Sequence, residues 1–136
     1  MIEYQHIFRV AYPDTDQMGT VHHANYVKFY EAARWEMFRS IGISYASIEE
    51  AGFLLPVIRM NFRFRKPTHY DALLRVHTIL KEISGARMWF TYKLYNQDNQ
   101  LINEAETELA FVLKDSWKPC LPPAFVLDAI EKVQKH

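Results

Sequence analysis

The sequence lacks, or has little of, several features that would each be enough to assign a protein to a particular class. Its 136 residues include one cysteine, Cys120, so no internal disulfide can form and a reducing compartment is expected. No apolar run approaches the roughly 20 residues of a membrane-spanning helix. No cysteine cluster has the spacing of a zinc site. Basic and acidic residues number 16 each, which argues against binding nucleic acid or a membrane surface through bulk charge.

The N-terminal segment alternates apolar and polar residues and carries Glu3, so it does not resemble a signal peptide, and a cytoplasmic location is expected. There is no internal repeat, linker or low-complexity segment, so residues 1–136 are expected to form one domain. Hydrophobic residues make up 49% of the chain and aromatic residues 15%. A small monomer cannot easily bury so many rings, and some are expected to line a subunit interface or an apolar ligand channel.

Strict alternation of apolar and polar residues predicts β-strands in five places. They lie near residues 2–12, 58–64, 74–80, 88–94 and 105–113. The last three follow one another through short turns, which is typical of an antiparallel meander. In the second strand, the four apolar residues from Ile58 to Phe64 are expected to face inward.

Apolar residues at spacings of three and four predict one long amphipathic helix between Tyr26 and Ile41. Asn25 is a plausible N-cap, and Gly42 stands where a helix usually stops. Shorter helices are expected over residues 45–51 and 125–133. A single helix of about eighteen residues cannot cover five strands from both faces, so an antiparallel sheet curved around the helix is expected.

The chemically active groups are concentrated in the stretch Tyr12–Tyr30, which reads YPDTDQMGTVHHANYVKFY. A loop of turn-forming residues places the carboxylate of Asp16 seven residues before His23, where the helix is expected to start. A helix start offers free backbone N–H groups and the positive end of the helix dipole. A carboxylate and such donors on one short loop can act on the same carbonyl group.

The pattern Tyr-x-Asp-Thr-Asp-x-x-Gly-x-Val-x-His-x-x-Tyr over residues 12–26, followed by Phe-Tyr-Glu-Ala-Ala-Arg at 29–34, resembles the signature of the 4-hydroxybenzoyl-CoA thioesterase family. Within that family the sequence is most similar to bacterial acyl-CoA thioesterases associated with the Tol–Pal region. The resemblance covers nearly the whole chain. It implies an α+β hotdog fold, in which a sheet of about five strands wraps around one long central helix. It also implies homodimers or homotetramers made by pairing sheets, with active sites where subunits meet.

The resemblance implies that Asp16 is the catalytic carboxylate, either as nucleophile or as general base, with His23 and Tyr12 beside it. An aspartate in an arbitrary turn usually hydrogen-bonds its own backbone, and Asp14 is expected to do so. His22 matches no required position of the signature and is interpreted as structural. Tyr12 is equally compatible with a core tyrosine at the end of a strand.

The candidate substrate-binding residues are Asn25, Tyr26, Lys66 and Arg87. Lys66 and Arg87 are expected at a strand end and a turn, where a basic side chain can contact the phosphates of coenzyme A. The long helix also carries a carboxylate, Glu31. Because the loop already supplies an acid, Glu31 is expected to pair with Arg34 or Lys28.

The sequence therefore predicts an acyl-CoA thioesterase, which converts a thioester and water to a free acid and coenzyme A with no metal or redox cofactor. An acyl-carrier-protein thioesterase, with the same chemistry and a protein partner, is one alternative. A non-catalytic acyl-thioester-binding or scaffold protein that uses the same cleft is another. A hotdog dehydratase is disfavoured because its His-Phe-Pro pattern is absent. The identity of the acyl group stays open.

Overall fold

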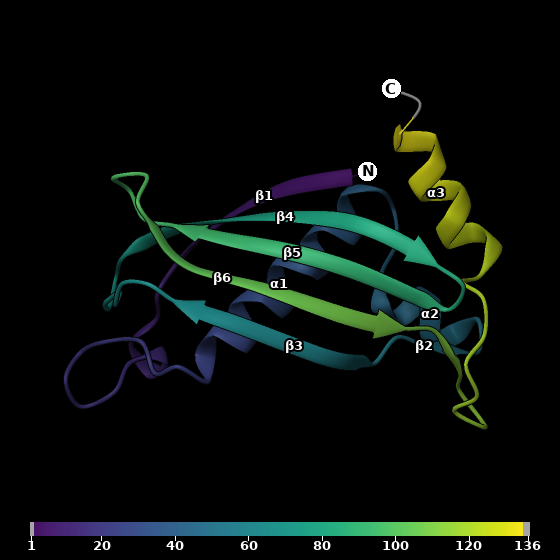
Figure 1. The fold of residues 1–136 in the computed structure, drawn as a ribbon, viewed down its shortest axis with the longest axis horizontal. Helices are drawn as coiled ribbons and strands as arrows, with labels where there is room; N and C mark the ends of the chain where they lie inside the picture. Colours follow the sequence, from purple (N-terminus) through teal and green to yellow (C-terminus); the bar gives the residue numbers. More distant parts are fainter. Residues whose placement is uncertain (1, 135–136) are drawn as a thin grey trace.

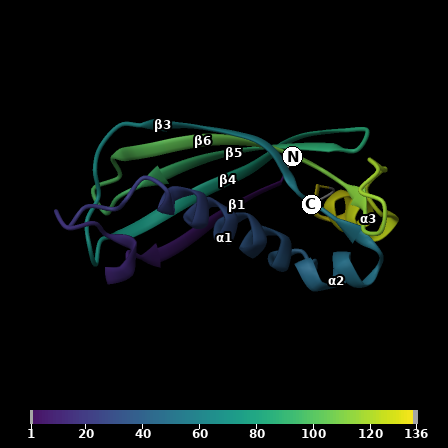
Figure 2. The same ribbon diagram turned by 90° about the horizontal axis from the view of Figure 1, so that it is seen from below.

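The computed structural model describes residues 2–134. Its main element is a five-stranded antiparallel sheet, with the strand order β1-β4-β5-β6-β3 and a long helix along one face (Figures 1 and 2). The strands are β1 (Ile2–Arg9), β3 (Val57–Phe64), β4 (Leu73–Ser84), β5 (Arg87–Tyr95) and β6 (Leu101–Ala110). The strands β2 (Phe53–Leu54) and β7 (Val112–Leu113) form a separate small ladder. The helices are η1 (Tyr12–Asp14), α1 (Asn25–Ser40), α2 (Tyr45–Glu50) and α3 (Ala124–Gln134).

The five predicted strands and the antiparallel meander of β4, β5 and β6 are confirmed, although several boundaries differ, most clearly in the first and the fifth strand. The first strand ends at Arg9, because the chain turns into η1 shortly after Val10. The fifth begins at Leu101, earlier than predicted, since the polar side chain of Asn103 occupies the core face and interrupts the apolar alternation. Tertiary contacts thus override the local pattern at that point.

The long helix is confirmed as α1, with 16 residues, but the predicted N-cap is wrong. Ala24 occupies the N-cap position without a side-chain hydrogen bond, and Asn25 is the first helical residue. The side-chain amide of Asn25 donates instead to the backbone oxygen of Asp14, at 2.7 Å, so it ties the helix to the preceding loop. Gly42 ends the helix as predicted, with a φ of +87° that glycine adopts without a steric penalty.

The helix α1 lies closest to β1 and β4, and the edge strand β3 is poorly covered (Figure 2). Ile58 and Phe64 of β3 are 50% and 57% exposed. The expected inward orientation is borne out for Phe62, which packs against the core and stacks on Tyr30 of α1. Ile58 and Phe64 also lie in this row but stay largely exposed, because an edge strand receives neighbours on one side only and α1 lies nearer β1 and β4. None of the helices described between residues 2 and 134 is long and apolar enough to cross a membrane.

Candidate active site

The loop between η1 and α1 lies at the end of the sheet where β3 ends (Figure 1). Two isolated bridges hold it in place, one between Thr15 and Val21 and one between Thr20 and His69. The Val21 N–H also donates to the backbone oxygen of Thr68, at 2.9 Å. These contacts attach the loop to the segment between β3 and β4, so its position is defined from both sides.

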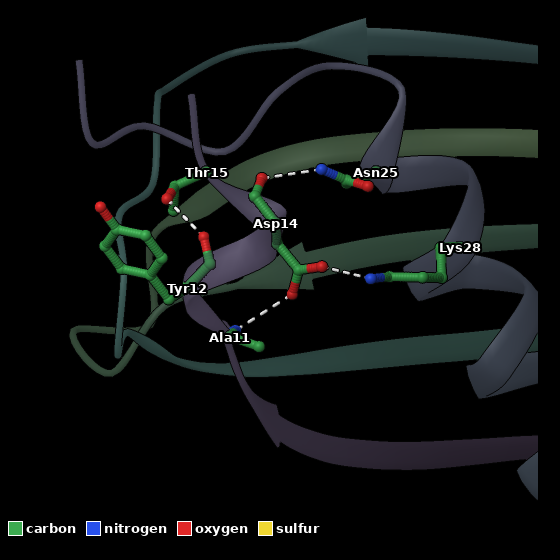
Figure 3. Close-up of polar contacts among 6 residues, drawn as sticks. All are labelled: Ala11, Tyr12, Asp14, Thr15, Asn25 and Lys28. Carbon is green, nitrogen blue, oxygen red and sulfur yellow. Dashed lines mark hydrogen bonds and ion pairs between the residues drawn. The ribbon is translucent and has the colours of Figure 1, made fainter. Parts of the chain in front are cut away.

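Asp14 connects the end of β1, the loop and the first turns of α1 (Figure 3). Its side chain is 6% exposed, and one carboxylate oxygen pairs with Lys28 Nζ. The other carboxylate oxygen accepts from the Ala11 N–H at 3.0 Å, which confirms the predicted turn hydrogen bond. The backbone oxygen of Asp14 accepts from Asn25 Nδ2 at 2.7 Å and from the His22 N–H at 3.1 Å. The ion pair was not foreseen, because no local pattern relates positions 14 and 28.

Asp16, the predicted catalytic carboxylate, is partly exposed and held in a fixed orientation. Its Oδ1 accepts from the backbone N–H groups of Met18 and Thr20 at 2.9 and 3.3 Å, and the Thr20 hydroxyl donates to Oδ2 at 3.1 Å. The hydrogen bond from Met18, followed by those from Thr20, outweighs partial desolvation and lowers the pKa of Asp16. The loop therefore presents an ionised carboxylate, and its catalytic role stays a prediction.

His22 and His23 lie side by side at the start of α1, both exposed, with ring centroids 4.3 Å apart. The Nδ1 atom of His22 accepts a hydrogen bond from the Ala24 N–H at 3.2 Å. His22 thus caps the helix start, in agreement with its structural interpretation. The imidazole of His23 faces no hydrogen-bond partner within the described chain, so it is available to a ligand.

Among the backbone N–H groups of residues 22–26, at the start of α1, the one of His23 differs from its neighbours. The N–H groups of His22, Ala24, Asn25 and Tyr26 all have acceptors within the chain. The His23 N–H has no acceptor among residues 2–134. It stands at the positive end of the α1 dipole, where a developing negative charge is stabilised. Of the backbone N–H groups at this helix start, the one of His23 is therefore the candidate for the predicted oxyanion site, and that role stays a prediction.

The two tyrosines of the predicted site have different surroundings. Tyr12 is 73% exposed, with its ring edge-on to Tyr70 at 5.5 Å, so its interpretation as a core residue is wrong. The chain turns into η1 at this point and carries the ring away from the core. Tyr26 is buried, with its ring edge-on to Phe29 and Phe64. Burial raises the pKa of Tyr26, so its hydroxyl stays protonated at neutral pH.

The basic candidates Lys66 and Arg87 lie at opposite ends of the sheet (Figure 1). Lys66 follows β3, near the loop, and its backbone N–H donates to Ile102 O at 3.1 Å. Arg87 begins β5 at the other end, and its guanidinium pairs with Glu108. Glu108 is 5% exposed and also accepts from Arg59 at 2.9 Å. Within one chain the structure does not bring Lys66 and Arg87 together.

The predicted pairing of Glu31 with Arg34 or Lys28 is wrong. Lys28 reaches Asp14, and Arg34 turns into the core, where Nη1 donates to the hydroxyl of Tyr92 at 3.1 Å. Helical spacing places these groups near Glu31, but the rotation of α1 against the sheet decides where each points. Among residues 2–134, no group of three or more His, Cys, Asp or Glu side chains could hold a metal ion.

Residues 10–130 match the thioesterase-like superfamily. The acyl-CoA thioester hydrolase YbgC of Escherichia coli O157:H7 is 36% identical over 121 residues, which cover 88% of this chain and 90% of that protein. A crystal structure of a DHNA-CoA thioesterase from Staphylococcus aureus superposes with a TM-score of 0.91 at 30% identity, covering 99% and 93% of the two chains. A 4-hydroxybenzoyl-CoA thioesterase mutant shares the fold, with a TM-score of 0.83 at 20% identity over 93% and 97%.

These matches and the sheet-and-helix architecture define a hotdog-fold protein of the thioesterase class. The chain belongs to the thioesterase-like superfamily. The resemblance inferred from the motif of residues 12–34 is thereby confirmed, and with it the hotdog fold.

Proposed function

We propose that the protein is an acyl-CoA thioesterase that uses water and no metal or redox cofactor. The observation that carries the proposal is the ionised carboxylate of Asp16 on the same short loop as the unoccupied His23 N–H. The names of related proteins support the substrate class. YbgC of Escherichia coli is an acyl-CoA thioester hydrolase, and the Staphylococcus aureus neighbour is a DHNA-CoA thioesterase. A cytoplasmic location stays a prediction from the sequence.

In the proposed mechanism, the thioester carbonyl oxygen accepts a hydrogen bond from the His23 N–H. As the carbonyl carbon becomes tetrahedral, negative charge develops on that oxygen, and a well-aimed donor of this kind stabilises it by roughly 3–4 kcal/mol. Asp16 either attacks the carbon or takes a proton from the attacking water. The C–S bond then breaks, and a proton is delivered to the thiolate of coenzyme A. The exposed His23 imidazole is suited to carry that proton. If water attacked, the free acid forms in this step; if Asp16 attacked, an acyl–Asp16 anhydride forms, and water then hydrolyses it to the acid and the free carboxylate.

The proposal is tested by measuring thiol release from short-chain, long-chain and aromatic acyl-CoAs. Turnover of at least one class is expected, and the panel then identifies the acyl group. Hydrolysis of acyl-carrier-protein thioesters alone would favour the protein-linked substrate. Saturable acyl-CoA binding by a folded protein that hydrolyses neither kind of thioester would favour the non-catalytic alternative.

The pH dependence of kcat/KM should report on Asp16. The hydrogen bonds from Met18 and Thr20 lower the pKa of Asp16, so its carboxylate stays charged as the pH falls through about 3.9, the ordinary value. No loss of kcat/KM from protonation of Asp16 is therefore expected between about pH 5 and 8. An acid limb centred above about pH 5, in a protein that stays folded, would contradict the assignment of Asp16 as the acting carboxylate.

The free edge of β3 supports a homodimer as the active form. This edge strand has eight residues, and its exposed Val57, Ile58 and Phe64 are apolar. A long apolar edge strand is prone to pair with another chain. A two-fold axis beside β3 would pair two such edges antiparallel and join the two sheets into one. The exposed apolar row would then be covered.

This dimer would also unite the basic residues that one chain keeps apart. Antiparallel pairing of the β3 edges places the start of β5 in one subunit at the same end as the catalytic loop of the other. Arg87 of the partner subunit would then lie on the side of Lys66, where both can contact the phosphates of coenzyme A. The active site is therefore proposed to take residues from both subunits.

Mixed dimers provide the test. Asp16→Asn and Arg87→Glu should each lower activity alone, whereas co-expression should restore about a quarter of the wild-type activity, because half of the dimers contain one intact site. The matched control is co-expression of Asp16→Asn with His23→Gln, which should restore nothing since both positions lie in one loop. A monomer at assay concentration, or equal behaviour of the two mixtures, would rule out the shared site.

A further inference from the structure

Arg34 is a buried arginine without an acidic partner. It lies on the third turn of α1 and is 3% exposed. Its Nη1 donates to the Tyr92 hydroxyl at 3.1 Å, and that hydroxyl shares a hydrogen bond of 2.8 Å with Thr107 Oγ1. None of the ion pairs found among residues 2–134 involves Arg34. Its Nε is buried without a hydrogen-bond partner.

A buried guanidinium without a counter-charge does not favour the stability of the folded state. Burial removes the guanidinium from water, and one hydrogen bond to a neutral hydroxyl compensates for little of the lost hydration. An apolar side chain of similar length that fills the same space is often neutral or stabilising at such a site. The role of an arginine at this position therefore depends on the groups that its hydrogen bond holds in place.

A second directional contact lies one helical turn earlier. The Tyr30 hydroxyl donates to Asn103 Oδ1 at 2.6 Å. Two successive turns of α1 are thus bonded to two neighbouring strands, Tyr30 to β6 and Arg34 to β5. Apart from Tyr26, the other buried side chains of the helix are apolar: Phe29, Ala33, Met37 and Phe38. Such packing resists a small slide of the helix less than hydrogen bonds do, because hydrogen bonds weaken steeply with distance and angle.

The same helix carries the candidate oxyanion donor at its start. Sliding α1 by a single residue along its axis would move the His23 N–H by about 1.5 Å. Misplacement of a reacting group by about 1 Å can lower a rate by ~100-fold. We propose that Arg34 is a positioning residue, which fixes the axial position of α1 through Tyr92 and so aims the His23 N–H at the substrate carbonyl. The inference rests on the thioesterase function proposed above.

The test compares stability with turnover in Arg34→Met, which keeps the length of the side chain and removes its donors. The midpoint of thermal unfolding should stay equal or rise, whereas kcat should fall about 10-fold or more with KM within about twofold. Arg34→Lys keeps one donor for Tyr92 and should recover part of the lost kcat. The matched control is Arg39→Met, an exposed position on the same helix, which should behave as the wild type.

Tyr92→Phe removes the acceptor and keeps the ring, so it tests the same hydrogen bond if Arg34→Met fails to fold. It should lower kcat similarly, and the double variant should lose no more than either single variant. Amide hydrogen exchange over residues 22–28 should accelerate in both variants and not in Arg39→Met. Exchange can be read even if the wild type hydrolyses no thioester, a result that would refute only the proposed function. The proposal is overturned if kcat or hydrogen exchange is unchanged in Arg34→Met. It is also overturned if the loss of kcat is matched by a loss of stability and Arg34→Lys does not restore kcat.

Discussion

Asp16→Asn should lower kcat/KM for acyl-CoA hydrolysis by about 100-fold or more, the size typical of losing a positioned acid–base group. The amide oxygen of asparagine can still accept from the N–H groups of Met18 and Thr20, so the turn is preserved and the negative charge is removed. Without that charge, neither attack on the carbonyl carbon nor activation of water can proceed at the normal rate. Thiol release and the midpoint of thermal unfolding are measured together, so that a loss of activity is not confused with a loss of fold.

The matched control is Asp98→Asn, which makes the same chemical change at an exposed position in the turn between β5 and β6. It should leave both quantities unchanged. Full activity in Asp16→Asn would show that the catalytic assignment is wrong. Glu31, the exposed carboxylate of α1, would then be the next group to test.

Lys28→Met should destabilise the fold by about 2 kcal/mol, because it leaves the carboxylate of Asp14 buried and without its cation. The figure is below that of a fully buried pair, since the lysine side chain is 61% exposed and water screens part of the attraction. Activity should fall as well, because this ion pair joins the loop that carries Asp16 to the helix whose start carries the proposed oxyanion donor, the His23 N–H. Denaturant unfolding measures the loss of stability, and thiol release measures the loss of activity.

The double variant Asp14→Asn/Lys28→Met should be more stable than Lys28→Met alone, because a buried amide needs no counter-charge. Lys93→Met, at an exposed position of β5, is the matched control and should change stability little. If Lys28→Met is as stable as this control, the ion pair with Asp14 contributes nothing to the fold.

Much of the fold could be predicted because its signals are local. The alternation in β4 and β5 and the three-and-four spacing in α1 each describe one element and the face it buries. Prediction was wrong where a contact between distant segments changed the role of a residue. Asn25 looked like a helix cap and instead donates to Asp14, and Asn103 hid the start of β6 because its polar side chain accepts from Tyr30 inside the core.

In the candidate site, too, the features that follow from neighbouring residues could be predicted, and those that depend on distant contacts could not. The motif of residues 12–26 located Asp16 and His23, since a contiguous signature can be recognised without knowing any tertiary contact. It could not show that the His23 N–H is the unoccupied donor, because that depends on which acceptors the folded loop supplies. Nor could it show that Asp14 is buried against Lys28.

The sequence by itself determined the order of strands and helices, the apolar face of most of them, and the loop that carries the candidate catalytic residues, because each of these follows from neighbouring residues. Only the tertiary structure decided that Arg34 bonds to Tyr92, that β3 keeps a free edge, and that Lys66 and Arg87 lie at opposite ends of the sheet. The physical reason is that periodicity specifies which side of an element is apolar. Which neighbour that side meets depends on strand order and on the rotation of the helix, and these arise from the packing of the whole chain.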